Sequence, residues 1–107
     1  MALNTVTTVS AAQLNRGIEI HFEQGVKGRG LKLRQVFPEL GVEGTKEVYA
    51  VIDPLLKFVV KLADQSMRHG GITEDEALAK LKEMAPYLED SVATLLMSYM
   101  RHNAAHG

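Results

Sequence analysis

A small, mainly α-helical single domain is the fold class that this sequence predicts, and three observations favour it. The chain has 107 residues, a length typical of one domain. Hydrophobic residues make up 46% of it and charged residues 23%, a balance typical of a folded chain. Apolar residues in the second half recur at spacings of three and four, the period of an amphipathic helix. We therefore expect a bundle of four to five helices over residues 10–101, a flexible segment at 1–9 and a frayed tail at 102–107.

The central helix is expected to begin at Asp53 and Pro54. Asp can cap the free amides of a helix start, and Pro suits the first helical position. Gly70 and Gly71 are typical of a helix end. Between these limits apolar residues cover most of the circumference, so we expect neighbouring helices on more than one side.

Two further helices follow the central one. Thr73 and Glu76 have the spacing of a capping box, which marks a helix start. Pro86 lacks the amide needed to continue that helix, so the helix must end or kink there. The same proline suits the first turn of a last helix, which we expect to run from Pro86 to about residue 101.

The first half of the chain allows two interpretations. Ser10 and Gln13 have capping-box spacing, which favours a helix. Residues 17–23, GIEIHFE, instead alternate between apolar and polar, which is typical of a strand. Residues 18–37 are therefore either two helices joined by a flexible loop or a short β-hairpin. We favour helices, because the rest of the chain is helical and an isolated hairpin is marginally stable.

Residues 45–53 carry the same ambiguity. They are rich in residues that favour strands, yet Thr45 could cap a helix that runs on through a kink at Pro54. Pro38, Gly41 and Gly44 indicate a connector over 38–44 in either case.

One stretch is both basic and rich in glycine. Residues 25–34 read GVKGRGLKLR and contain no acid. The order of residues fits neither a P-loop nor a dinucleotide-binding fingerprint. Glycine lets backbone amides approach a phosphate closely, and several cations can contact several phosphates. The candidate anion-binding or nucleic-acid-binding residues are Lys27, Arg29, Lys32 and Arg34. The alternative is a solvated, mobile loop.

The remaining polar residues indicate no catalytic or metal site. The chain has no cysteine, which removes disulfides and thiolate chemistry. His102 and His106 have a spacing that could hold a metal, but no acid lies near them in the sequence. The acidic clusters stand at helix starts, where the helix dipole explains them. We expect no enzyme, no catalytic residue, no cofactor and no metal.

The apolar surface exceeds what a small bundle readily covers. Met84, Met97 and Met100 lie in the last two helices, and methionine is common at protein-binding surfaces. A symmetric homodimer is the commonest oligomer, so we expect self-association. The predicted partner interface comprises Phe58, Leu62, Val92, Leu95, Leu96, Tyr99 and Met100. The alternative is that all of them belong to the core of the monomer.

These observations predict a small non-enzymatic interaction or assembly module, with the profile of an accessory protein of a bacterium or phage. It would form a homo-oligomer and present the basic loop to an acidic partner. One alternative is a nucleic-acid-binding accessory or regulatory protein that uses the same loop, although a net charge of −1 gives no global attraction to nucleic acid. Another is a small enzyme or metal-binding protein with an unidentified site. The first residues lack signal-peptide features and no apolar run approaches a membrane span, so we expect a cytoplasmic protein without membrane contact.

Overall fold

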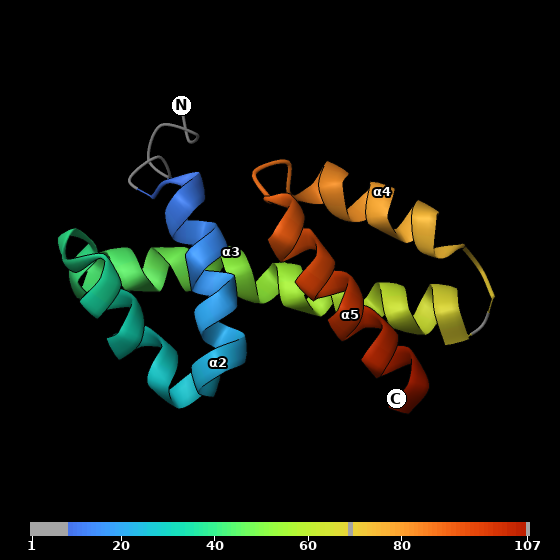
Figure 1. Cartoon of the computed structure of the whole chain (residues 1–107), viewed down its shortest axis with the longest axis horizontal. Helices are drawn as coiled ribbons and strands as arrows, with labels where there is room; N and C mark the ends of the chain where they lie inside the picture. Colours follow the sequence, from blue (N-terminus) through green and yellow to red (C-terminus); the bar gives the residue numbers. More distant parts are fainter. Residues whose placement is uncertain (1–8, 69, 107) are drawn as a thin grey trace. The chain divides into compact units, whose positions relative to one another are not determined.

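The computed structural model describes residues 9–68 and 70–106, and its regular elements there are all helical (Figure 1). Four α-helices, α2 to α5, occur in the described residues, which confirms the mainly helical class and gives the lower of the expected helix numbers. The chain divides into two compact units, Met1–Asp53 and Pro54–Gly107. In the described residues, every helix is too short or too polar to cross a membrane. The expected flexible segment at 1–9 falls almost wholly outside the described residues.

The first unit begins with α2, which spans Ala11–Val36. Its start is the predicted capping box. The amide of Gln13 donates to Ser10 Oγ at 3.1 Å, and the amide of Ser10 donates to Gln13 Oε1 at 2.8 Å. The helix then runs through residues 18–36, so the β-hairpin interpretation is wrong. The alternating pattern arises because Ile18 and Ile20 are both fully buried, on different sides of one helix.

Gly25 interrupts α2 with φ 77° and ψ 178°, a conformation that is outside the helical region and essentially restricted to glycine. Figure 1 shows the two halves of α2 meeting at a bend, the first drawn in blue and the second in cyan to teal. Residues 26–36 are therefore the second, helical half of α2, and we call them the basic segment. The expectation of a Gly-rich loop here is wrong, because only Gly25 departs from helical geometry while Gly28 and Gly30 lie inside the helix.

A short 3-10 helix, η1 (Pro38–Leu40), links α2 to α3, which spans Gly41–Leu62. The connector that we expected over residues 38–44 therefore ends at Leu40, and residues 41–44 already belong to α3. The helix start expected at Asp53 and Pro54 is also wrong, because α3 continues through Pro54, as in our alternative. Pro54 has no amide hydrogen to donate to the carbonyl of Ala50. Both residues are exposed, so water can satisfy that carbonyl.

The two helices of the first unit approach each other closely at Gly17. A Cβ atom built on Gly17 would lie 2.8 Å from Ile52 Cδ1 and 2.9 Å from Val48 Cγ1. Both of these side chains are fully buried. The hydroxyl of Tyr49, on the same part of α3, donates to the carbonyl of Gly17 at 3.0 Å. Glycine at this position is what allows α2 to pack against α3.

The second unit begins with the C-terminal part of α3 and continues into a π-helical turn, η2 (Ala63–Arg68). The chain then turns at Gly70, whose φ of 68° confirms the expected glycine stop. The helix α4 (Glu74–Met84) starts at the predicted capping box, in which the amide of Glu76 donates to Thr73 Oγ1 at 3.1 Å. It ends before Pro86, as predicted.

The last helix, α5, spans Asp90–His106 and packs against η2 and α4. It does not begin at Pro86, because the chain turns at residues 86–87, where the amide of Leu88 donates to the carbonyl of Ala85 at 3.1 Å. The helix continues through His106, within the segment for which we expected a frayed tail.

Candidate interaction surfaces

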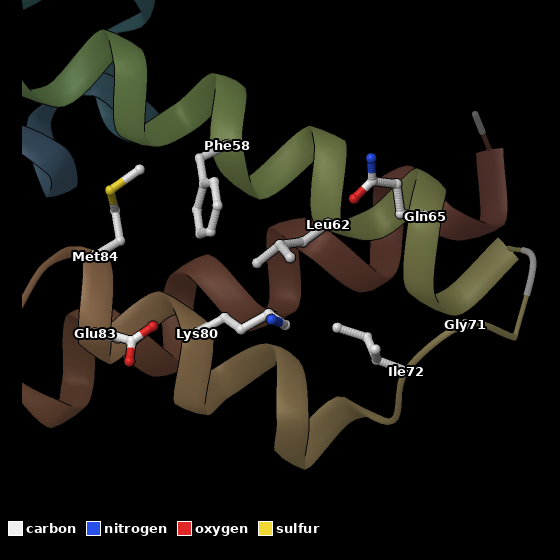
Figure 2. Close-up of a pocket in the computed structure, with 8 residues that line it drawn as sticks. All are labelled: Phe58, Leu62, Gln65, Gly71, Ile72, Lys80, Glu83 and Met84. Atoms are coloured by element: carbon white, nitrogen blue, oxygen red, sulfur yellow. The ribbon is translucent and has the colours of Figure 1, made fainter.

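The clearest concave surface lies within the second unit, between α3 with η2 on one side and α4 on the other (Figure 2). Its volume is about 570 Å³. Both helices and the loop between them contribute side chains. The lining residues are Phe58, Leu62, Gln65, Gly71, Ile72, Lys80, Glu83 and Met84.

The chemistry of this groove is that of an apolar floor with a few polar groups. Figure 2 shows Phe58 and Leu62 pointing from α3 toward α4, with Met84 pointing back from the end of α4. Met84 is 53% exposed, a large value for an apolar side chain. The polar groups are one amide, one ammonium and one carboxylate, from Gln65, Lys80 and Glu83. Such a surface can accept apolar side chains and orient them with a few hydrogen bonds or ion pairs.

The seven residues of the expected partner interface differ in how deeply they are buried. Leu62, Val92, Leu96 and Met100 are buried, whereas Phe58, Leu95 and Tyr99 are half-buried. Only Phe58 and Leu62 line the groove. Most of the apolar side chains of α5 are thus buried within the chain, because α5 packs against η2 and α4.

The four cations of the basic segment differ in whether they form an ion pair. Arg29 has a partner, because its Nη1 and Nη2 donate to Asp53 Oδ1 and Oδ2, each at 2.9 Å. Its side chain is only 11% exposed. The guanidinium carbon lies 4.0 Å from the centre of the Tyr49 ring, a cation–π geometry. Arg29 therefore serves to attach the basic segment to α3, and its charge is already paired.

His21 completes this cluster from the first half of α2. Its Nδ1 lies 2.8 Å from Arg29 Nη1, and since a guanidinium has only donors, Nδ1 must be the acceptor. Burial lowers the pKa of His21, Arg29 lowers it further, and Asp53 opposes them. Burial likewise raises the pKa of Tyr49 to about 12, so its hydroxyl stays protonated and can donate to Gly17.

The other three cations of the basic segment have no such partners. Lys27 is exposed, and Lys32 and Arg34 are half-buried. In the part of the chain that the structure describes, no carboxylate forms an ion pair with any of them. Lys27 and Arg34 share one helix face with Leu31, which is 58% exposed. The result is a cationic stripe with an apolar residue in the middle.

Metal ligands do not gather anywhere in residues 9–68 and 70–106, where no group of three or more His, Asp or Glu side chains is placed to hold an ion. His102 is exposed on α5, and the side chain of His106 lies outside the described part. The i,i+4 spacing of these two histidines therefore gains no third ligand from the described residues.

Sequence reasoning missed most of the residues that form these surfaces. Asp53 and Tyr49 reach Arg29 from across the first unit, and no local pattern pairs residues that lie 24 positions apart. In the groove, Ile72 and Glu83 are brought to Phe58 only by the packing of α4 against the preceding helix. Met84 carried a usable signal, because an exposed methionine is typical of protein-binding surfaces.

Comparisons with known proteins give no relative for this chain, since no family model, no curated protein and no solved structure matches it.

Proposed function

We propose that this protein is a small non-enzymatic interaction module that self-associates through the groove of its second unit. The observation that carries this function is the groove itself, in which Phe58 of α3 is half-buried and Met84 of α4 is 53% exposed. Burying one such side chain against a partner contributes about 1.5–3 kcal/mol. A few anchors of this kind are enough for a specific contact between proteins.

A protein partner suits the groove better than a small ligand does. Its volume of about 570 Å³ is large enough for either occupant. A small ligand, however, is usually fixed by polar groups that converge on it, whereas the groove offers one amide, one ammonium and one carboxylate along an apolar floor. Such lining matches an apolar side chain carried on a helix or loop of another protein.

A second copy of the chain is the partner that we favour, because most soluble oligomers are homo-oligomers. The interface is centred on Phe58 and Met84 rather than on α5. Val92, Leu96 and Met100 are buried within the chain, so they contribute to the fold and not to the contact.

The basic segment gives this module a second binding surface, suited to an acidic partner. Lys27, Lys32 and Arg34 have no ion pair among the described residues, so their charges are available. Nucleic acid is the second candidate for this surface. Its support is the same set of cations, but Leu31 is 58% exposed between two of them, which suits a protein surface better than a row of phosphates.

Sedimentation equilibrium over a wide range of protein concentrations tests self-association. Met84→Glu places a carboxylate at the edge of the groove and should weaken association. Val60→Glu is the matched control, because Val60 is 39% exposed in the same unit and does not line the groove. A wild-type protein that stays monomeric throughout, or equal effects of both substitutions, would contradict the proposed contact.

A gel shift with single- and double-stranded nucleic acid at low and at physiological salt separates the two candidates for the basic segment. Phosphate contacts predict a shift that weakens steeply as salt rises. If no shift occurs at low salt, nucleic acid is excluded as the partner of the basic segment. An acidic protein is then the remaining candidate.

A further inference from the structure

Two helical segments of equal length carry complementary exposed faces. The basic segment covers residues 26–36, and α4 covers 11 residues, Glu74–Met84. We infer that the basic segment of one copy docks antiparallel against α4 of a second copy. This docking rests on the self-association proposed above and names the surfaces that meet in it.

The charges of the two faces have the same spacing in opposite directions. On the basic segment, Lys27 and Arg34 are seven residues apart with Leu31 between them. On α4, the carboxylates of Glu83 and Glu76 are also seven residues apart, with Ala79 between them at the matching position. Residues at these spacings share one helix face, and seven residues span about 10 Å along a helix. In an antiparallel pair, Lys27 therefore meets Glu83, and Arg34 meets Glu76, whose Oε1 accepts from the amide of Thr73 while Oε2 faces the arginine.

The exposed apolar residues match in the same register. Leu31, which is 58% exposed, lies opposite Ala79. Ala79 lines a shallow hollow of about 290 Å³ together with Glu76, Lys80 and Glu83, so a leucine side chain finds space there. Val26, which is 68% exposed, lies opposite Met84, which is 53% exposed. Because Met84 and Glu83 also line the groove, the docked segment reaches the edge of the groove.

The glycines of the basic segment gain a role in this register. The two lysines of α4, Lys80 and Lys82, fall opposite Gly30 and Gly28, so that no lysine of α4 meets a cation. Glycine is unfavourable inside a helix. Packing within the chain does not require it here, since a Cβ atom on Gly28 or Gly30 would meet no atom closer than 3.4 Å or 3.6 Å, respectively.

Arg29 takes no part in the docked face. It pairs with Asp53 in its own chain, and in the antiparallel register it falls opposite Leu81, which is fully buried. The buried residues of the two helices thus lie at the same levels and point away from the contact. The exposed residues of each helix face the other helix.

A charge-exchange experiment on the full chain tests this docking by sedimentation equilibrium. Lys27→Glu alone and Glu83→Lys alone each bring like charges together and should each raise the Kd of self-association about tenfold. The variant with both substitutions restores opposite charges and should associate nearly as well as wild type. Lys57→Glu is the matched control, because Lys57 is an exposed lysine of α3 that belongs to neither docking segment and lines neither the groove nor the hollow at Ala79, so it should leave the Kd unchanged. Circular dichroism checks that each variant keeps its helices.

The outcomes separate this docking from the proposed function. If Lys27→Glu behaves as Lys57→Glu does, or if the double variant recovers nothing, the antiparallel pairing is overturned. If at the same time Met84→Glu weakens association, self-association through the groove stands without this docking. A wild-type chain that is monomeric at every concentration overturns both.

Discussion

Arg29 and Asp53 form a bidentate ion pair, in which the Nη1–Oδ1 and Nη2–Oδ2 distances are both 2.9 Å. The pair joins the second half of α2 to α3 across 24 positions of sequence. Arg29 also touches His21 and lies over Tyr49, so one guanidinium holds three side chains from two helices. Together with the fully buried Leu33, this residue holds the basic segment in place within the first unit.

Replacing Arg29 with lysine should lower the free energy of unfolding by about 1–2 kcal/mol, although the charge is kept. Lysine presents a single point charge, so it cannot bond both oxygens of Asp53 and loses the planar contact with Tyr49. The exposure of Asp53, 46%, keeps the effect below that of a fully buried pair. Urea unfolding followed by circular dichroism measures it. Arg34→Lys is the control, with an expected change within about 0.5 kcal/mol, and equal losses in both variants would contradict the role given to Arg29.

His21 should make stability depend on pH. In the folded protein its pKa lies below the ordinary value of 6.5, because burial and then Arg29 disfavour the imidazolium, while Asp53 opposes them. The unfolded chain therefore binds the proton more readily. The free energy of unfolding should fall as pH is lowered through 6.5 toward the pKa of the folded state.

His21→Asn tests this dependence, because the amide oxygen of Asn can accept from Arg29 but does not titrate. We expect the wild type to lose stability relative to the Asn variant between about pH 7 and about pH 5. The ring of Phe22, 5.3 Å away in an edge-to-face contact, carries no charge and is unchanged in both proteins. Stability curves that run parallel over this range would exclude His21 as the source.

Gly17→Ala should destabilise the first unit by about 1–3 kcal/mol through overpacking. The added methyl group would lie 2.8 Å from Ile52 and 2.9 Å from Val48, and both of these side chains are fully buried and cannot move aside cheaply. Gly28→Ala is the matched control. Its nearest neighbour would be the exposed Gln24 at 3.4 Å, so the gain in helix propensity, up to about 1 kcal/mol, should prevail. Thermal unfolding of both variants measures the difference, and changes of the same sign would contradict the close approach at Gly17.

Local signals in the sequence predicted the helix boundaries that depend on local chemistry. The capping boxes at Ser10 and Thr73 are contacts between residues three apart, and both are present in the structure. The turn at Gly70 and the end of α4 before Pro86 also follow from the residues themselves. These features need no knowledge of tertiary packing.

Tertiary packing decided the features that local patterns could not predict. The alternation at Ile18 and Ile20 resembles a strand, but it comes from a helix that is covered on two sides. Pro54 has the appearance of a helix start, yet α3 passes through it because the carbonyl that loses its partner is exposed to water.

The candidate surfaces were predictable only as residue types. The cations of the basic segment were evident from the sequence, but their division into one paired arginine and three available charges depends on Asp53, which is distant in sequence. The groove depends on the packing of α4 beside α3, so the sequence marked Phe58 and Leu62 as apolar surface residues but gave no sign of Ile72 and Glu83.

The bend at Gly25 has a stereochemical consequence. Its φ of 77° and ψ of 178° are the mirror image of an extended conformation that ordinary L-amino acids adopt with ease. Beyond the neighbouring backbone, an added Cβ of the L configuration would meet no atom of the described residues within 4 Å, so backbone conformation, not packing, opposes an L side chain here. The backbone at position 25 therefore favours one configuration: a D-alanine introduced by chemical synthesis matches the φ and ψ of the bend and should stiffen it, whereas its L-enantiomer would resist it.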